Sequence, residues 1–244
     1  MSTDEFIAPH CAEEIGILFE DEDLLVIEKP SGLLSLSGRN PLNKDSVHDR
    51  LFKQYAGVAM VHRLDIGTSG LMILARNKAV NSHLTKQFQA RTISKTYVAL
   101  LYGHVIGDQG VIDVPIAKDE FPRQKACFQT GKLAQSPYQV TQRSLYGAGH
   151  NSGAGHNSGA GHNSGAGFKV SRVIFTPASG RTHQLRIHSQ YIGHPIIGCD
   201  LYGDVIDGMN TLTLSNRLCL HASGLEFEHP TSGERLFFES ECNF

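Results

Sequence analysis

Short apolar stretches separated by turn residues dominate the pattern of hydrophobic and polar positions along the chain. Stretches of this kind, rich in valine, isoleucine, leucine and tyrosine and bounded by glycine, proline or acidic residues, predict β-strands. One of them, Leu71–Ala75, is apolar throughout and predicts a buried strand. The predicted strands are Ile17–Glu20, Leu24–Lys29, Leu71–Ala75, Thr96–Tyr102, Val111–Ala117, Lys125–Gln129, Tyr138–Leu145, Phe168–Thr176, Leu218–Glu228 and Arg235–Glu239.

Three segments repeat their apolar residues at helical spacing instead. Asp45–Tyr55 predicts a short amphipathic helix, and Asn77 is a suitable N-cap for a second helix. Arg181–Ile192 predicts a third helix, with Gly193 at its end and Pro195 just beyond. Because strands outnumber helices and many are joined by hairpin-like turns, we expect an α+β fold with a mixed, mostly antiparallel sheet and flanking helices.

The segment Gly147–Gly167 interrupts this pattern with the repeated unit GAGHNS, which places His150, His156 and His162 at even spacing. It contains no large apolar side chain, so it cannot bury enough surface to offset its chain entropy. A zinc site would need ligands in fixed geometry, usually with acids or thiols, and the segment has neither. We expect a flexible insertion between two strands; adventitious metal binding stays open.

Composition narrows the class of protein. The chain has 244 residues, of which 40% are hydrophobic, enough for one large domain or two small ones. No apolar run reaches the roughly 18–20 residues that span a bilayer, and the acidic N-terminus MSTDEFIAPHCAEE does not resemble a secretory signal. The five cysteines are scattered without a CxxC motif, so neither a disulfide framework nor a zinc knuckle is indicated. We expect a cytoplasmic protein that does not associate with membranes.

Charge argues against a protein that coats nucleic acid through bulk basicity, because the net charge is −2. The acids concentrate in Glu13–Glu28 and Glu226–Glu241, whereas bases outnumber acids between Arg50 and Arg143. This distribution favours a local basic surface for an anionic substrate, and random scatter is the alternative.

The segment VHRLDIGTSG carries the first candidate for chemistry, Asp65. This acid lies between the strand-like residues VHRL and a loop of small residues, a position that can present a carboxylate at a cleft. The hydroxyls of Thr68 and Ser69 and the amides of the turn could orient it. On this segment alone, an Asx-turn that uses Asp65 only to shape the backbone is the simpler interpretation.

Two further segments carry candidate residues. SGRTHQLRIHSQYIGHPIIGCDLYG packs Arg181, His183, Arg186, His188 and His194 into a short span. His183 and His188 lack the i, i+4 spacing of a helical zinc pair, so Arg181 orienting a carboxylate or binding phosphate is the stronger interpretation. In ISKTYVALLYG, Tyr97 is either a core tyrosine or an aromatic platform for a base.

Taken together, HRLDIGTSG, SKTYVALLYG and GRTHQLRIH…GHPIIGCDLYG resemble the signature blocks of the RluA-type pseudouridine synthases. The resemblance extends from about Ile17 to Phe238 and is interrupted only by the repeat. The stretches KPSGLLSLSGR, KDSV and FPRQKACFQTGKLAQSPYQV also resemble the branch of this family that acts on both rRNA and tRNA. The resemblance implies the pseudouridine synthase fold with a central catalytic cleft, formed by residues 15–244 after a tail at residues 1–14. No S4-type RNA-binding domain is expected.

The resemblance also implies roles for individual residues. Asp65 matches the essential aspartate, which attacks the glycosidic carbon of uridine directly or through a glycal intermediate. Arg181 matches the arginine that pairs with this aspartate, and Tyr97 matches the tyrosine that stacks on the uracil and assists loss of the proton at carbon 5. Arg63 matches an arginine that fills the gap left by a flipped base. Further residues of these blocks expected to contact RNA are His62, Thr68, Gln184 and Arg186.

The implied reaction is an isomerisation that needs no cofactor and no metal. The implied partners are a tRNA anticodon stem-loop and a 23S rRNA hairpin, and a monomer is expected. Alternatives are an enzyme of the same family with only one of these RNA targets, a catalytically silent RNA-binding module and a metal-dependent hydrolase that uses some of the thirteen histidines.

Overall fold

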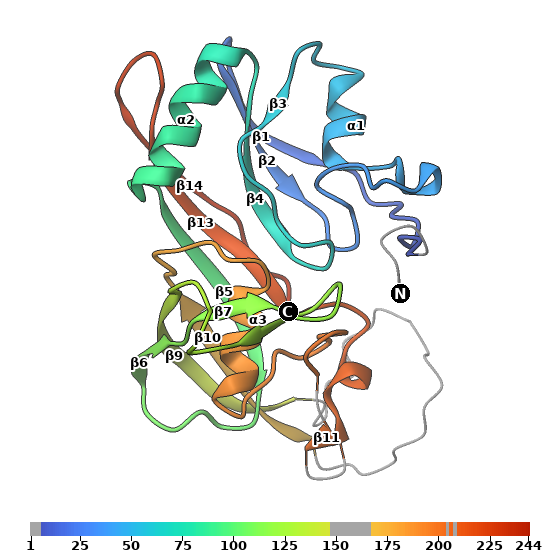
Figure 1. Ribbon diagram of the computed structural model, residues 1–244, viewed down its shortest axis with the longest axis vertical. Helices are drawn as coiled ribbons and strands as arrows, with labels where there is room; N and C mark the ends of the chain where they lie inside the picture. Colours follow the sequence, from blue (N-terminus) through green and yellow to red (C-terminus); the bar gives the residue numbers. More distant parts are fainter. Residues whose placement is uncertain (1–5, 147–166, 204, 207–208) are drawn as a thin grey trace.

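A mixed sheet of ten strands runs through the whole molecule in a computed structural model that describes residues 6–146, 167–203, 205–206 and 209–244 (Figure 1). The strand order is β1-β2-β4-β13-β5-β10-β9-β6, with β3 beside β4 and β14 beside β13. The strands of this sheet are β1 Gly16–Glu20, β2 Leu24–Lys29, β3 Ala59–Met60, β4 Ser69–Ala75, β5 Ser94–Tyr102, β6 Gln109–Asp113, β9 Gln135–Tyr146, β10 Phe168–Phe175, β13 Leu220–Glu228 and β14 Arg235–Glu239. Two small hairpins complete the strands, one from β7 Ile116–Lys118 and β8 Gln124–Ala126, the other from β11 Val205–Ile206 and β12 Met209–Asn210.

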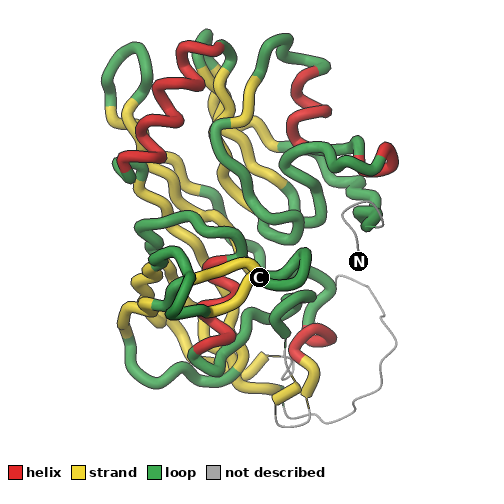
Figure 2. Tube along the Cα trace, viewed as in Figure 1, coloured by secondary structure: helices red, strands yellow, loops and turns green. Residues whose placement is uncertain are grey.

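The helices are few and lie against the sheet (Figure 2). They are α1 Val47–Phe52, α2 Lys78–Ala90 and α3 Gln184–Tyr191, with 3-10 turns at Pro41–Asn43 and Thr211–Leu214. The predicted cap is confirmed, because the Asn77 side chain accepts a hydrogen bond from the backbone N–H of Val80. The α+β class and the mixed, mostly antiparallel sheet are confirmed as well.

β4 supports two separate cores with its alternating side chains. Met72 and Leu74 pack with α1 on one face, and Leu71 and Ile73 pack with α2 on the other. Burial on both faces explains the continuous apolar run that predicted this strand. A third core, around β5, β9, β10 and α3, fills the other half of the molecule.

β13 joins the two halves at the centre of the sheet. It pairs in parallel with β4 through His221–Ser69 and Ala222–Gly70, and antiparallel with β5. The contact with β4 requires a glycine, because a Cβ on Gly70 would lie 2.3 Å from the carbonyl oxygen of Ala222 and Gly70 has φ +107°. Ala222 also pairs with Tyr97 of β5. β13 therefore brings the segment that precedes β4 close to Tyr97.

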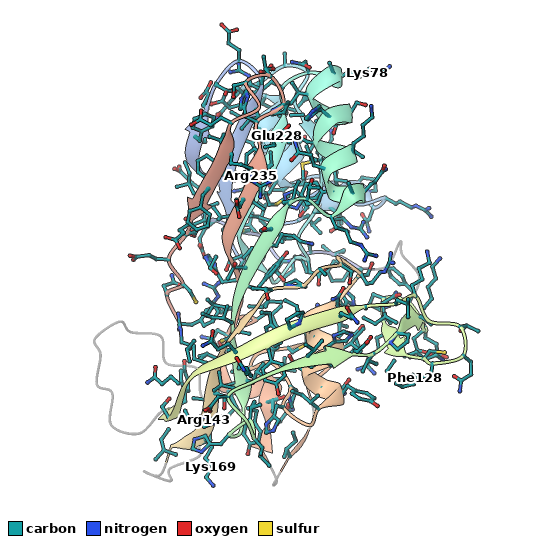
Figure 3. The ribbon with its side chains drawn as sticks, turned by 90° about the vertical axis from the view of Figure 1, so that its left-hand side faces the viewer. Lys78, Phe128, Arg143, Lys169, Glu228 and Arg235 are labelled. Atoms are coloured by element: carbon teal, nitrogen blue, oxygen red, sulfur yellow. The ribbon has the colours of Figure 1, made fainter. Side chains whose placement is uncertain are left out.

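The predicted hairpins also form. The Glu228–Arg235 pair begins the β13–β14 hairpin, and Figure 3 shows both side chains on neighbouring strands. Arg143 and Lys169 lie toward the opposite end of the molecule, near the ends of β9 and β10 that flank the repeat. The pair Tyr146–Phe168 closes the described part of that hairpin. The predicted insertion, Gly147–Gly167, lies outside the described residues except for its last glycine.

Several boundaries differ from the prediction, and the three described next change how a segment is assigned. Val61–Leu64 is not a strand, because strand β3 ends at Met60 and the chain then turns toward the pocket described below. The stretch Val111–Ala117 is divided between β6 and β7, which belong to different sheets, with Pro115 between them. Proline has no N–H for a sheet ladder, which fits a strand break here. Helix α3 begins at Gln184 and leaves Arg181 outside it.

The predicted N-terminal tail contains no helix or strand in its described part, residues 6–14, yet it is attached to the domain. The Asn43 side chain binds the carbonyl of Phe6 and the N–H of Ala8. The Arg50 guanidinium donates to the carbonyls of Cys11 and Glu13. The described helices include none that is both long and apolar enough for a membrane span.

Candidate active site

A pocket of about 500 Å³, which includes the solvent at its mouth, lies where the chain enters β4, next to β5 and the start of α3. Its walls come from the three segments that the sequence singled out. They are residues 63–65 with Thr68, Tyr97 of β5, and residues 177–186, closed below by Leu220 of β13. The topology therefore brings together candidate residues that are far apart in the sequence.

Asp65 begins a tight turn that projects its carboxylate into this pocket. The backbone N–H of Thr68 donates to the carbonyl of Asp65 at 3.1 Å, so the backbone closes the turn and the carboxylate lines the pocket. The interpretation of Asp65 as a mere Asx-turn residue therefore does not hold. The Asp65 side chain is 27% exposed, which leaves it accessible to a substrate.

A buried lysine holds this turn from beneath. The Lys29 ammonium donates to the carbonyls of Pro30, Leu33 and Ile66 at 2.8, 2.7 and 3.1 Å. The Ser31 hydroxyl adds a bond to the carbonyl of Gly67 at 2.7 Å. Burial lowers the pKa of Lys29 to about 7, with Cys11 and Asp65 opposing this effect. The KPSG stretch thus supports the turn that carries Asp65, a contact that the sequence did not reveal.

Arg186, and not Arg181, is the arginine beside Asp65. Its Nη1 lies 3.8 Å from Asp65 Oδ2, and the buried guanidinium is also bound to Asp200 and to Cys199 Sγ. Burial opposes the charge on Arg186, but Cys199, Asp200 and Asp65 outweigh it, so its pKa is raised. The pairing expected for Arg181 and the RNA contact expected for Arg186 are therefore corrected.

The position at which α3 begins explains why Arg186, and not Arg181, lies beside Asp65. Arg186 lies in the first turn of α3, and helical side chains lean toward the helix N-terminus, here toward the pocket. Arg181 precedes the helix, and its Nε donates to the carbonyl of Leu133 at 3.3 Å. It lines the pocket from the outer wall, where it is partly exposed to solvent.

Tyr97 forms an aromatic wall of the pocket. Its position on β5 is fixed by pairing with Ala222 of β13 and Phe175 of β10 on its two sides. Burial, together with the nearby charge of Asp65, raises the pKa of its phenol, so the hydroxyl keeps its proton at neutral pH.

The predicted RNA-contacting residues divide into two groups. Arg63 and Thr68 line the pocket, Arg63 as an exposed side chain and Thr68 as a buried one. His62 does not: its Nε2 accepts from the N–H of Ile73 at 3.0 Å, and its ring stacks on Phe88 at 4.6 Å. Burial lowers the pKa of His62 to about 3, so it is a neutral side chain packed between β4 and α2. The structure thus shows His62 packed within the protein, and its expected contact with RNA stays a prediction.

Gln184 borders the pocket but is occupied by the protein. Its Oε1 accepts from the Ser179 hydroxyl and the N–H of Arg181, and its Nε2 donates to the carbonyl of Gln135 and to the Ser136 hydroxyl. The side chain is buried and has all its bonding positions filled. It shapes the Gly180–Arg181 turn, and its expected contact with RNA stays a prediction.

No set of three acidic, histidine or cysteine side chains arranged to hold a metal ion occurs in the described part of the chain. The chemistry available in the pocket is that of one carboxylate beside a buried guanidinium, facing an aromatic wall. A single carboxylate of this kind can act as a nucleophile toward a bound substrate.

Comparisons with known proteins show the family of the chain. The sequence model of the RNA pseudouridylate synthase family matches residues 23–191. The chain is 43% identical over 218 residues to the dual-specificity RNA pseudouridine synthase RluA of Vibrio vulnificus, covering 88% of this chain and 78% of the relative. It is 38% identical to the Yersinia pestis protein of the same name, covering 93% and 99% of the two chains.

A solved structure shows the same fold. The human RNA pseudouridylate synthase domain containing 1 superposes with a TM-score of 0.74 at 26% identity, covering 96% of this chain and 85% of the human chain. The matched region contains Asp65, Tyr97 and Arg186, which the structure gathers around one pocket. The chain therefore belongs to the RNA pseudouridylate synthase family.

Proposed function

We propose that this protein converts uridine to pseudouridine in two stem-loop RNAs, a tRNA anticodon stem-loop and a hairpin of 23S rRNA. The observation that carries the reaction is the placement of the Asp65 carboxylate in an open pocket between Tyr97 and Arg186. The dual target is supported by the Vibrio vulnificus and Yersinia pestis relatives, whose names describe dual specificity.

In the proposed reaction, Asp65 promotes cleavage of the bond between C1′ of the ribose and N1 of uracil. The detached uracil turns in the pocket, a bond forms between C1′ and C5, N1 gains a proton and C5 loses one. Arg186 balances the charge of the carboxylate, since an opposite charge favours the ionised form. Tyr97 provides the surface on which the uracil stacks while it turns.

The target nucleotide must leave the base stack, because Asp65 lies within a pocket and cannot reach the sugar of a stacked residue. Arg63 stands exposed at the mouth of the pocket, where it can occupy the space left by the flipped base. A stem-loop suits this step, because extruding an unpaired base costs less than extruding a paired one.

Cations at the rim of the pocket fit the phosphates on either side of that nucleotide. Arg63, Lys95 and Arg181 form no ion pair with a carboxylate within the described ranges, whereas Arg50 and Arg143 do. Lys95 lies two residues before Tyr97 on β5, with its Nζ 3.5 Å from the carbonyl of Ser179. Because phosphate contacts supply most of the affinity for RNA, these three cations are the proposed binding residues.

The β7–β8 hairpin extends this surface. It carries Lys118, and also Lys125, which forms an ion pair with Asp119. The exposed rings of Phe121 and Phe128 lie in and just after the hairpin. Figure 3 labels Phe128 at the outer end of this region, away from the central sheet. Exposed aromatic rings among cations suit the stacking of unpaired bases.

We also propose that the protein acts as a monomer in the cytoplasm without metal or cofactor.

The reaction is tested by release of tritium from RNA labelled at C5 of uridine, since C5 gives up its hydrogen when the new bond forms. We expect release by the wild type from both an anticodon stem-loop and a 23S rRNA hairpin transcript. Asp65→Asn should release none, because an amide cannot supply the carboxylate. Asp108→Asn is a matched control, as it removes a surface carboxylate whose side chain is 84% exposed.

Equal release by Asp65→Asn and wild type would contradict the role of Asp65. Release from only one transcript would restrict the enzyme to a single RNA. No release by the wild type from either would reject the proposed targets.

A further inference from the structure

His183 lies in the pocket in an unusual backbone conformation. It immediately precedes α3 and has φ 56° and ψ 19°, in the left-handed region. Residues other than glycine are uncommon there, and such conformations concentrate at functional sites. The conformation places the ring with Nε2 3.9 Å from Asp65 Oδ2 and Nδ1 2.8 Å from the hydroxyl of Tyr202.

The Tyr202 hydroxyl determines which nitrogen of His183 carries hydrogen. Tyr202 is buried, and its oxygen accepts a hydrogen bond from the backbone N–H of Gln124 at 2.8 Å. Within the described chain, the acceptor within reach of the hydroxyl's own proton is Nδ1 of His183. A neutral imidazole that accepts at Nδ1 must carry its hydrogen on Nε2, the nitrogen that faces Asp65.

The surroundings favour the neutral ring. Burial lowers the pKa of His183, with Asp65 opposing this shift and Arg186 reinforcing it. Asp65 faces the ring from the turn before β4, Arg186 from α3, Asp200 from the chain after α3 and Arg63 from the segment before the turn. The ring can therefore offer Asp65 an N–H donor at neutral pH without adding a second charge beside Arg186.

His183 and Arg186 approach the same oxygen of the carboxylate. Both contacts are to Oδ2, at 3.9 and 3.8 Å, so Oδ1 is the oxygen left for the substrate. These separations exceed a hydrogen bond, but catalytic hydrogen bonds are often long in an unliganded enzyme and shorten when the substrate binds.

We propose that His183 and Tyr202 are positioning residues for Asp65: the Tyr202 hydroxyl fixes the Nε2–H tautomer of His183, and this N–H holds Oδ2 so that Oδ1 faces the sugar. The proposal rests on the proposed function, because it takes Asp65 as the reacting group. His183 lines the pocket and Tyr202 lies behind it, and in this proposal both residues act through the carboxylate.

The first test is the tautomer of His183 itself, read from side-chain ¹⁵N chemical shifts of the labelled protein and assigned with a His183→Gln variant. We expect hydrogen on Nε2 in the wild type and a mixture of tautomers in Tyr202→Phe. Hydrogen on Nδ1 in the wild type, or no change in Tyr202→Phe, overturns the proposal. This measurement needs no RNA, so its result is independent of whether the proposed reaction is correct.

The second test is single-turnover tritium release. Tyr202→Phe keeps the ring under the Arg186 guanidinium, 5.3 Å from it, and removes only the hydroxyl. We expect a rate about tenfold lower with RNA affinity within twofold, the effect of losing one orienting hydrogen bond. His183→Leu should lose more than His183→Gln, whose amide N–H can reach the position of Nε2.

Tyr55→Phe is the matched control, since it loses a hydroxyl bonded to Glu20 far from the pocket, and its rate should equal that of the wild type. Thermal unfolding of each variant shows whether it is folded. A wild-type rate in folded Tyr202→Phe, or equal rates for His183→Leu and His183→Gln, overturns the proposal. Failure of the wild type to release tritium would instead count against the proposed function.

Discussion

At the scale of single residues, the choice between two arginines of one motif depends on where a helix begins. Arg181 and Arg186 both stand in GRTHQLRIH, and the sequence pattern extends the helix over both of them. The structure starts α3 at Gln184, so only Arg186 acquires a helical orientation toward Asp65. Helix boundaries are the least certain part of a sequence pattern, because caps and tertiary contacts decide them.

Replacing each arginine by lysine separates the two roles. Arg186→Lys should lower kcat by about 100-fold, because an ammonium cannot bind Asp65, Asp200 and Cys199 together. Arg181→Lys should mainly raise KM, because it keeps the charge at a partly exposed rim position but loses the planar fork that binds phosphate. Steady-state tritium release measures both parameters. A larger loss of kcat in Arg181→Lys than in Arg186→Lys would restore the pairing that the sequence suggested.

Lys29 makes a prediction about pH and stability. Its pKa falls from 10.5 in the unfolded chain to about 7 in the folded protein. Between these values the unfolded chain binds one proton more, so this residue's contribution to the free energy of unfolding increases as pH rises from 7 to 10. The difference in unfolding free energy between wild type and Lys29→Met should therefore rise, by at most about 1.4 kcal/mol per pH unit.

Urea denaturation of both proteins at several pH values measures this difference. Subtracting the unfolding free energy of Lys29→Met from that of the wild type cancels, to first order, the contributions of all other titrating groups. A difference that stays flat, or that falls with pH, would show that Lys29 keeps its proton in the folded protein.

At the scale of elements, the predictable parts were those whose pattern is local. Leu24–Lys29 and Arg235–Glu239 match β2 and β14 at both ends, and Asn77 caps α2 as its sequence position indicates. The strand character of Val61–Leu64 was predicted wrongly, although the composition of this segment suits a strand. The segment leaves the sheet and contributes to the wall of the pocket. Partner strands and the pocket set its path, and neither is visible in a short window of sequence.

The β4–β13 contact yields a stability prediction at this scale. Gly70→Ala should lower the unfolding free energy by several kcal/mol, because its Cβ would meet the Ala222 backbone and the residue keeps a positive φ. Gly107→Ala is the matched control: Gly107 has φ +83° but open space around its Cβ, so about 1 kcal/mol is expected. Chemical denaturation gives both values, and equal losses would contradict the backbone clash.

At the scale of the whole molecule, the site combines residues from both halves of the sheet. Local patterns identified Asp65, Tyr97 and the GRTHQ block separately, but no periodicity indicates that they meet. Only the resemblance to a family joined them in advance. The hydrogen bonds of His183, Tyr202 and Lys29 cannot be predicted from local patterns because they join separate segments, although the matching blocks contain all three residues.

Removing the repeat tests whether folding and activity of the domain depend on it. Replacing Gly147–Gly167 by a short turn should leave the melting temperature and tritium release close to those of the wild type. The reason is that β9 and β10 pair along their lengths up to Tyr146 and Phe168 without it. Differential scanning calorimetry and the tritium assay provide the two measurements. A large loss of turnover with unchanged melting would show that the repeat contacts RNA or guards the pocket.

The central place of β13 also has a consequence for synthesis on the ribosome. Asp65 and Tyr97 are made early, yet the strand that sets them side by side comes from residues 220–228. A nascent chain that ends before this strand contains Asp65 and Tyr97 without the strand that brings them together. The pocket can therefore form only after β13 has emerged.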